Sequence, residues 1–325
     1  MRLAVFSLAL LLASAALAQV PLPTPGFHHL HLNSTDPDAA IAFYVRQFPS
    51  TAKSSFAGLA ALKAGNVLVL FTKVNAKPPT QPQTALWHFG WHVADVHQSL
   101  ALFQQRPEVR LLPLYTTDEG GAVFVSSDTW PGFGGSLGRT KSQIAEAQGA
   151  GIQPTHGAGF GYIEGPDGAI IEYQGNMPVE RFNHVHLFEK DPFCAQLWYQ
   201  QHLNAAPAAA APGAAPLSEA NCKVPRPELS WPSLERGGML RQPAGVTFSG
   251  VAVTWHVQQN ETPLAPSRGH VMDHFALSVA DLEAWIAKLR REGVKFLMKP
   301  HQLGDTRAVM IEGPSREAIE LVEIK

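Results

Sequence analysis

The chain has 325 residues, of which 45% are hydrophobic and 16% are charged, and its formal net charge is -2. This is the composition of an ordinary globular protein, although Pro and Gly are frequent. The near-neutral charge gives no electrostatic reason to expect nucleic acid or an anionic membrane surface as a partner, and we predict neither.

Residues 1–18 have the pattern of a secretory signal peptide. Arg2 precedes an apolar run over residues 3–17, and small residues at 16–18 form a cleavage site before Gln19. The apolar run is too short for a transmembrane span, and an uncleaved anchor is the alternative interpretation. We therefore expect a mature protein that is periplasmic or secreted and has no membrane contact after cleavage.

The chain contains two cysteines, Cys194 and Cys222. In an oxidising compartment such a pair can form a disulfide, and two unrelated buried thiols are the alternative. Neither cysteine belongs to a Cys-x-x-Cys motif, which excludes a zinc ribbon and a thioredoxin-like redox site.

One pattern of apolar residues and histidines occurs four times. Each copy begins with an apolar strand that carries histidine, continues with an aspartate that caps an amphipathic stretch of helical length, and ends with further apolar strands. A repeat of this kind indicates one supersecondary unit copied along the chain. The first strands of the four copies are expected at 27–33, 86–93, 181–188 and 272–279.

The remaining elements follow in the same order within each copy. Helices are expected at 36–48, 95–105, 141–147, 191–203 and 281–292. Later strands are expected at 56–62, 66–71, 109–114, 121–126, 160–173, 246–257, 294–299, 308–312 and 318–324. Each copy is thus a βαβββ module.

Antiparallel strands that follow one another in such modules should curl into open sheets, with the helices on the convex faces. Two modules side by side would enclose a cavity. We therefore predict an α+β fold with curled mixed sheets and two domains, 26–178 and 181–325, while pairing of module one with module four stays open. The modules are 26–77, 86–178, 181–258 and 270–325.

Two motifs connect this repeat to a known family. One is the histidine on each first strand, and the other is Gly-Pro-Asp-Gly at 165–168, followed by Glu172. The repeat with these motifs resembles the vicinal oxygen chelate superfamily, which includes glyoxalase I, extradiol dioxygenases, and fosfomycin- and bleomycin-resistance proteins. The resemblance covers about residues 26–325, and its motifs are not specific to one activity.

The resemblance implies two sets of metal ligands. Two imidazoles and a carboxylate leave open positions for a substrate that chelates through two oxygens, and they suit Fe(II) or Mn(II), with Zn(II) or Ni(II) as alternatives. A single strand histidine is more often a core residue, but four equivalent ones favour ligation. The first implied set is His29, His88 and Glu172, and the second is His184, His274 and Glu320.

The first set also resembles the site of ring-cleaving dioxygenases, which implies that His156 and Tyr162 steer protons there. Met310 replaces this tyrosine in the second half of the chain, and His301 stands in for His156. A phenol can donate a hydrogen bond to a metal-bound oxygen and a thioether cannot, so the first set is the better candidate for catalysis. A packed strand aromatic is the alternative interpretation of Tyr162.

We therefore expect a divalent-metal-dependent enzyme that acts on a small substrate with vicinal oxygens, with a dioxygenase acting on a catechol-like compound as the leading hypothesis. It would be a monomer or a homo-oligomer. A glyoxalase-like isomerase or lyase and a non-catalytic binding protein of the bleomycin-resistance kind are the alternatives. Glyoxalase I is less favoured because the resemblance implies an acidic general base on the last strand of module one, and the strand at 66–72 has no acidic residue. The matching strand of module three has His256 instead.

Overall fold

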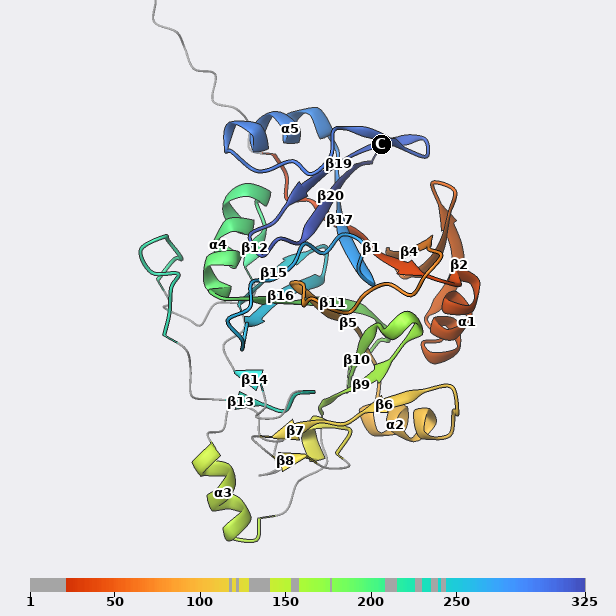
Figure 1. Ribbon diagram of the computed structural model, residues 1–325, viewed down its shortest axis with the longest axis vertical. Coiled ribbons are helices and arrows are strands. Elements are labelled where there is room, and N and C mark those ends of the chain that lie inside the picture. The colour runs from red at the N-terminus through yellow and green to blue at the C-terminus, as the bar shows by residue number, and fades with distance from the viewer. Residues whose placement is uncertain are drawn as a thin grey trace, which may run out of the picture.

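Two mixed sheets of eight strands each form the body of the protein, which is therefore an α+β fold as predicted (Figure 1). The computed structural model describes residues 22–116, 119–120, 123–128, 141–152, 158–175, 177–207, 215–225, 230–234, 239–240 and 244–324. The predicted signal peptide, 1–18, lies outside the described residues. Within them, no helix is long and apolar enough to cross a bilayer.

The first sheet combines modules one and four, and we call it the 1/4 sheet. Its strand order is β18-β19-β20-β17-β1-β4-β3-β2. The antiparallel pairing of β1 with β17 joins the two modules. The strands are β1 (Gly26–Ser34), β2 (Thr51–Phe56), β3 (Leu59–Ala64), β4 (Val67–Lys73), β17 (Met272–Val279), β18 (His301–Leu303), β19 (Thr306–Glu312) and β20 (Ala318–Glu323).

The second sheet combines modules two and three, and we call it the 2/3 sheet. Its strand order is β12-β15-β16-β11-β5-β10-β9-β6, with β5 and β11 antiparallel at the junction. The strands are β5 (Leu86–His92), β6 (Arg110–Leu112), β9 (Phe160–Glu164), β10 (Ile170–Gln174), β11 (Arg181–Glu189), β12 (Ala206–Pro207), β15 (Ala244–Phe248) and β16 (Val251–Val257).

This module pairing differs from the one implied by the predicted domains 26–178 and 181–325. Those boundaries follow the order of modules along the chain and place module two beside module one. Each sheet instead takes one module from each half. Of the two pairings that the sequence left open, the structure has module one with module four, because β1 pairs edge to edge with β17 and not with β5.

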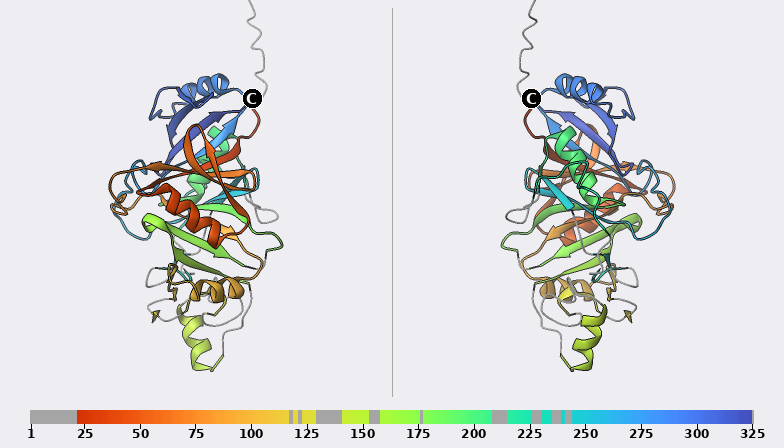
Figure 2. Two further views of the ribbon diagram at one scale, coloured as in Figure 1. Left: turned by 90° about the vertical axis from the view of Figure 1, so that its right-hand side faces the viewer. Right: turned by 90° about the vertical axis from the view of Figure 1, so that its left-hand side faces the viewer.

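Helices α1 and α4 lie at the junction of the two sheets, where the ring of Tyr44 in α1 is 5.9 Å from that of Trp91 and the ring of Tyr199 in α4 is 6.5 Å from that of Phe275, while α5 lies at the top of the molecule (Figure 2). Helices α1 and α5 pack on strands of the 1/4 sheet, and α2 and α4 pack on strands of the 2/3 sheet. The helices are α1 (Pro37–Gln47), α2 (Val96–Gln104), α3 (Lys141–Gly149), α4 (Pro192–Leu203) and α5 (Leu282–Arg291). Short elements complete the described chain: β7 (Tyr115–Thr116), β8 (Glu119–Gly120), β13 (Ser230–Trp231), β14 (Met239–Leu240), and the 3-10 turns Ser126–Asp128 and Pro166–Gly168.

The aspartates that were predicted to start the helices do so in all four modules. The Asp36, Asp95 and Asp281 side chains accept hydrogen bonds from backbone N–H groups of the first helical turn, which satisfies donors that the helix leaves free. Asp191 occupies the same N-cap position without a side-chain cap. The strand-to-helix junction is thus the most regular part of the repeat.

Several strand predictions were wrong. The strand expected over 246–257 is a hairpin of β15 and β16, because Ser249 and Gly250 adopt φ values of 48° and 81° and form a tight turn. Strand β2 was missed, since most of its residues are polar or small and it is an edge strand. The segment expected as a strand at 294–299 makes only the isolated bridge between Phe296 and Ile311.

One apolar core lies between the sheets and their helices. Phe27 of β1 is 5.8 Å from Phe182 of β11 and 6.0 Å from Phe275 of β17, measured between ring centroids. Leu30 and Leu32 also belong to this core. Because side chains alternate along a strand, His29 and His31 lie on the opposite face of β1. The histidines therefore lie on the face of the sheet that points away from the core.

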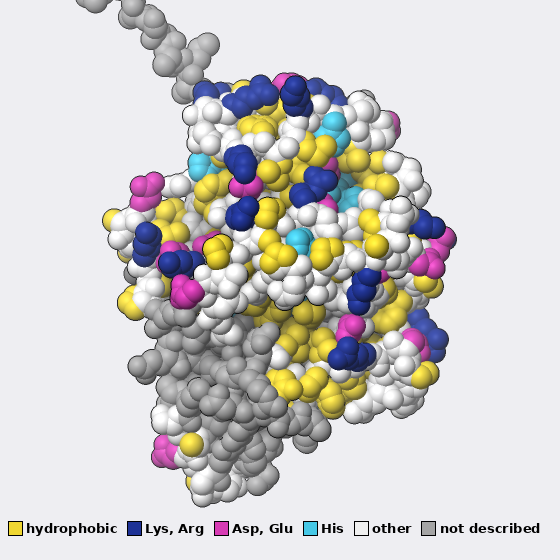
Figure 3. Space-filling view, viewed as in Figure 1, with side chains coloured by type: hydrophobic (Ala, Val, Ile, Leu, Met, Phe, Trp, Pro, Cys, Tyr) yellow, Lys and Arg dark blue, Asp and Glu magenta, His cyan; other side chains and the backbone are white. Residues whose placement is uncertain are grey.

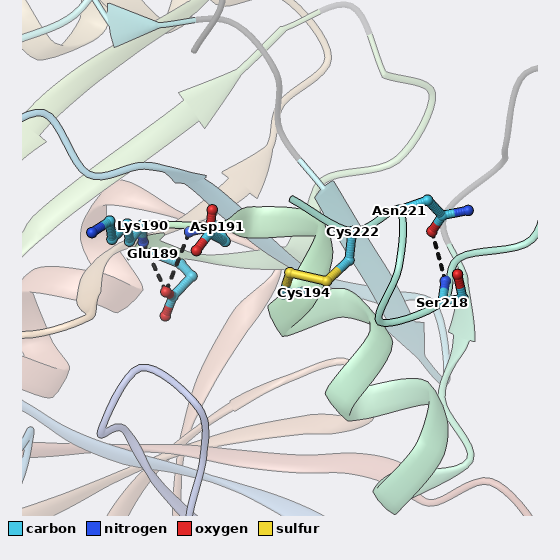
Figure 4. Close-up of a disulfide and its surroundings, with 7 residues drawn as sticks. All are labelled: Glu189, Lys190, Asp191, Cys194, Ser218, Asn221 and Cys222. Carbon is cyan, nitrogen blue, oxygen red and sulfur yellow. Dashed lines mark hydrogen bonds between the residues drawn. A yellow bond between two sulfur atoms is a disulfide. The ribbon is translucent and has the colours of Figure 1, made fainter. Parts of the chain in front are cut away.

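The two cysteines form a disulfide in module three (Figure 4). Cys194 lies in the first turn of α4, and Cys222 lies in the segment 215–225. The bridge ties this segment to the helix over a separation of 28 residues. Acidic and basic side chains are interspersed on the face of the molecule shown in Figure 3.

Candidate metal centres

A β-bulge precedes the predicted ligand histidine in each of the four modules. At these points the antiparallel register between β1 and β17, or between β5 and β11, skips one residue. Bulges bend a strand and re-aim its side chains, and they are frequent beside functional sites. The skipped residues are His28, Trp87, Asn183 and Asp273, and the histidines that follow them are His29, His88, His184 and His274.

In the 2/3 sheet, three histidines surround one glutamate. His88 Nε2 is 3.0 Å and His184 Nε2 is 3.8 Å from the carboxylate of Glu172, and His186 Nδ1 is 4.0 Å from it. One candidate ligand atom from each of the four residues lies within 4.8 Å of the others. We call these four residues the 2/3 centre.

In the 1/4 sheet, the same kind of cluster forms around Glu320. His29, His31 and His274 offer ligand atoms within 4.8 Å of one another. The carboxylate of Glu320 is 3.6 Å from His29 Nε2 and 3.7 Å from His274 Nε2, and it is 3.3 Å from His301 Nε2. We call His29, His31, His274 and Glu320 the 1/4 centre.

The structure brings all six predicted ligands into these two centres but divides the predicted triads. His29 joins His274 and Glu320, not His88 and Glu172. His184 joins His88 and Glu172 instead of His274. The reason is the pairing of modules, because residues on β1 face those on β17, and residues on β5 face those on β11.

His31 and His186 were not predicted as ligands. Each lies two residues after a predicted ligand, on the same face of its strand. The signal for them was the His-x-His pattern of modules one and three. Modules two and four have Gly90 and Ala276 at this position, and there the adjacent strand supplies Glu172 and Glu320 respectively.

The second histidine therefore replaces a carboxylate. His31 lies opposite Leu70 of β4, and His186 lies opposite Thr254 of β16, where modules two and four have glutamate. Each centre thus takes His and Glu from one module and His-x-His from the other. The two centres follow the same plan and are each made of three imidazoles and one carboxylate.

Burial keeps the imidazoles of the 2/3 centre neutral. It lowers the pKa of His88 and of His184 to about 3, and burial together with neighbouring histidines lowers the pKa of His186 well below its usual value. Burial raises the pKa of Glu172, and the nearby His184 opposes that rise. Neutral imidazoles have a free lone pair, which a metal ion requires.

The residues of both centres fit a divalent cation. The Nε2 atoms of His29, His184 and His274 are buried without a hydrogen-bond partner, although buried nitrogens are normally paired. Each of these atoms faces a buried carboxylate, which also needs a compensating charge. A cation held between imidazole nitrogens and the carboxylate would satisfy both groups.

Tyr162 lies beside the 2/3 centre, as predicted. It is opposite Glu172 in the register of β9 and β10, its hydroxyl hydrogen-bonds to the Glu172 carboxylate, and its ring is 5.1 Å from that of His88. Burial raises the pKa of the Tyr162 hydroxyl well above its usual value. His156, the second predicted catalytic residue, lies outside the described residues.

A cavity of about 440 Å³ opens onto the 2/3 centre. Glu172, His184 and His186 contribute to its wall, and so do Tyr162 and His256. Apolar side chains such as Phe160 and Met177 also line it. A small ligand in this cavity would therefore touch the ligand residues, a phenol and a further imidazole.

Comparison with known proteins identifies the second half of the chain. Residues 181–321 match the family model described as the Glyoxalase/Bleomycin resistance protein/Dioxygenase superfamily. This part of the chain is therefore similar to that superfamily. The match confirms the resemblance that the repeat indicates for this part of the chain, whereas the Gly-Pro-Asp-Gly motif lies outside the matched residues. No curated protein matches the chain by sequence.

Solved structures of the glyoxalase and dioxygenase kind share the fold over nearly the whole chain. Glyoxalase I from Zea mays has a TM-score of 0.57 and 14% sequence identity, and the match covers 92% of both chains. A putative dioxygenase from Bacillus subtilis has a TM-score of 0.55 and 10% identity, and the match covers 93% of this chain and 86% of the other. These likenesses establish the fold, whereas the activity depends on the residues of the centres.

Proposed function

We propose that the protein is an exported, divalent-metal-dependent enzyme that acts at the 2/3 centre on a small compound with vicinal oxygens. Dioxygenation of a catechol-like compound is the leading reaction. The observation that carries the proposal is the cavity whose wall combines Glu172, His184 and His186 with the buried hydroxyl of Tyr162. The size of this cavity suits a small molecule, and the candidate ligands Glu172, His184 and His186 are among the polar groups of its wall.

His88, His184 and Glu172 would hold the metal. A bound divalent metal would polarise two adjacent oxygens of a chelating substrate and lower their pKa, and bound Fe(II) would also allow reaction with dioxygen. His186 is the member of the centre farthest from Glu172 and is partly exposed to the cavity. It is therefore placed to contact the substrate.

The neighbouring side chains of this chain would control protons around the substrate. Because the pKa of Tyr162 is raised well above its usual value, its hydroxyl stays protonated and acts as a hydrogen-bond donor. Burial lowers the pKa of His256 to about 3, so this cavity-lining imidazole is neutral. A neutral imidazole can accept a hydrogen bond from a substrate hydroxyl.

A glyoxalase-like isomerase or lyase is the second candidate, and one observation favours it. The ligand atoms of all four residues of the 2/3 centre lie within 4.8 Å. If His186 also binds the metal, a chelating substrate completes a six-coordinate set and leaves no position for dioxygen. The described residues of the centre include only one carboxylate, Glu172, so proton abstraction would depend on a different kind of base.

The disulfide supports the proposal of export. Disulfides persist in oxidising compartments and are rare in the cytosol. Together with the pattern of residues 1–18, the Cys194–Cys222 bridge favours a periplasmic or secreted protein. Cleavage before Gln19 predicts the mass of the mature chain, which mass spectrometry of protein from an exporting host can measure. An intact N-terminus would contradict export by this route.

Metal analysis and oxygen consumption separate the candidate functions. Protein purified without added metal should contain Fe(II) or Mn(II), and it should consume oxygen with catechols. Zn(II) or Ni(II) with oxygen-independent turnover would favour the isomerase or lyase. Binding of an aromatic ligand by metal-free protein, with no turnover after metal is added, would favour a sequestering protein.

His186→Gln is the variant that decides between a three-ligand and a four-ligand centre. The dioxygenase proposal expects this variant to keep its metal and to lose substrate affinity. Loss of the metal itself would instead support the four-ligand centre and the isomerase or lyase. The matched variant is His31→Gln, which makes the same change in the 1/4 centre.

A further inference from the structure

The residue before a ligand histidine holds the Nδ1 atom of that histidine in three of the four modules. Asn183 Oδ1 lies 3.0 Å from His184 Nδ1, and Asp273 Oδ1 lies 2.6 Å from His274 Nδ1. In module one, the Nδ1 atoms of His28 and His29 are 2.8 Å apart. Adjacent residues of a regular strand point to opposite faces, so the bulges make these contacts possible.

These contacts determine which nitrogen faces the centre. An oxygen acceptor at Nδ1 requires that this nitrogen carry the hydrogen, so the lone pair is on Nε2. The Nε2 atoms of His184 and His274 are the buried nitrogens without partners that face the carboxylates. The bulged residue therefore both orients the ring and selects the tautomer that can bind a metal.

The amide of Asn183 is itself fixed in orientation. Its Nδ2 group donates to His92 Nε2 at 2.5 Å, so its oxygen is directed to His184. The partner of His184 is thus a neutral amide. It orients the imidazole but brings no charge to it.

Asp273 is a fully paired carboxylate. Its Oδ1 accepts from His274 and from Arg268 Nε at 2.7 Å, and its Oδ2 accepts from the Gly269 N–H at 2.7 Å and from Asn33 Nδ2 at 3.2 Å. Arg268 offsets part of the charge, but the hydrogen bond to His274 remains shorter than the one between Asn183 and His184. A carboxylate partner makes a ligand imidazole a stronger donor to a metal.

We propose that Asn183 and Asp273 are positioning residues that set the relative metal affinity of the two centres. The 1/4 centre binds its cation more tightly than the 2/3 centre. The inference rests on the proposed metal binding. As the metal concentration rises, the 1/4 centre fills first. The 2/3 centre, which opens onto the cavity, holds its cation less tightly and exchanges it more readily.

A reciprocal exchange of the two residues tests the ranking. Full-length His88→Ala leaves only the 1/4 centre, and full-length His29→Ala leaves only the 2/3 centre. Each is freed of metal and titrated with Zn²⁺ against a chromophoric chelator. Asp273→Asn should weaken zinc binding in the first background by about 10- to 100-fold, and Asn183→Asp should strengthen it in the second by a similar factor.

A matched control makes the same chemical change away from both centres. Asp281→Asn replaces the exposed N-cap residue of α5, a position where Asn caps a helix as well as Asp does. It should leave the zinc affinity of both centres unchanged. Tighter binding by Asn183→Asp is a result that a merely structural role of this residue would not produce.

The outcomes separate this ranking from the proposed function. Absence of zinc binding in both backgrounds would overturn the proposed metal chemistry and the ranking with it. Zinc binding in both backgrounds with equal affinities would overturn the ranking alone. The ranking would also be overturned if Asp273→Asn did not weaken zinc binding and Asn183→Asp did not strengthen it.

Discussion

The two sheets contain the same cluster of three histidines and one glutamate in different surroundings. In the 2/3 sheet, Tyr162 lies opposite the glutamate, and the cluster opens onto a cavity. In the 1/4 sheet, Met310 lies opposite the glutamate, and its sulfur accepts a hydrogen bond from Arg268 at 2.6 Å. The repeat thus duplicates the candidate metal ligands, while Tyr162 and the cavity favour the 2/3 centre for the proposed chemistry.

Removing one ligand from each centre tests this contrast most strongly. His88→Ala should remove the metal from the 2/3 centre and abolish turnover, because the substrate would have no cation to chelate. His29→Ala should also cost one metal per chain but affect turnover far less. Elemental analysis and product formation check both. Equal loss of turnover in the two variants would show that the centres do not divide their roles.

Replacing the phenol tests the contrast between Tyr162 and Met310. Tyr162→Phe should lower kcat by roughly 10²- to 10⁴-fold, the range for a group that assists proton transfer, with kcat compared at saturating metal because the Tyr162 hydroxyl also hydrogen-bonds to Glu172. Met310→Leu is the matched change in the 1/4 sheet and should leave kcat near the wild-type value. A Tyr162→Phe enzyme with normal kcat would mean that this residue is only a packed aromatic.

Gly90 and Ala276 occupy the same place beside a ligand histidine in the two sheets. A Cβ at Gly90 would lie 2.6 Å from His184 Nε2 and 2.7 Å from the Glu172 carbonyl oxygen, closer than real contacts allow. Gly90→Ala should therefore displace His184 and weaken metal binding at the 2/3 centre by about tenfold or more. Chelator competition measures this effect.

Ala276→Gly is the reverse change in the 1/4 sheet, where Ala276 lies opposite His29. It should keep metal binding and cost about 0.5–1 kcal/mol of folding free energy, since glycine weakens a strand. Unchanged metal affinity in Gly90→Ala would show that the 2/3 centre can shift to accept a methyl group.

The turn before the last strand of each sheet also differs. Module four has Glu317 three residues before the ligand glutamate, and module two has Ala169 at this distance from Glu172. Burial raises the pKa of Glu317 to about 8, although Tyr199 donates a hydrogen bond to its Oε1 atom at 2.6 Å. In the unfolded chain the same carboxyl has its ordinary pKa of 4.5.

The sign of the pH effect follows from these two values. Between pH 4.5 and about 8 the folded protein keeps a proton on Glu317 that the unfolded chain releases. The free energy of unfolding should therefore fall as pH rises through this window. Glu317→Gln should flatten the dependence, measured by denaturant unfolding at several pH values. Glu219→Gln, at an exposed carboxyl, should keep the wild-type slope, and a wild-type slope in Glu317→Gln would contradict the argument.

Local features of the sequence predicted the repeat well, and they located histidines and glutamates that the structure brings together in two clusters. The alternation of apolar residues located all four histidine strands, and the aspartates located the starts of four helices. Both signals depend on residues near each other in the chain. Strand β2 was missed because it contains no long apolar run. The turn at Ser249 and Gly250 was missed because apolar residues continue on both sides of it.

The grouping of ligands could not be read from local patterns. His29 and His274 meet because β1 pairs with β17, and nothing near either residue indicates that choice. The bulges could not be predicted from the sequence either, since they depend on the register between two strands that are distant in the chain. The Asn183-His184 and Asp273-His274 pairs stand in the sequence, but their contact follows only once the bulge turns both side chains to one side.

The order of the modules along the chain has a consequence for folding. The 2/3 sheet is encoded without interruption between β5 and β16, whereas the halves of the 1/4 sheet lie at opposite ends of the chain. During synthesis we expect the 2/3 sheet to assemble before the 1/4 sheet is complete, because β17 lies far along the chain from its partner β1. A chain that stops before the fourth module would leave β1 as a bare edge, open to association with other chains.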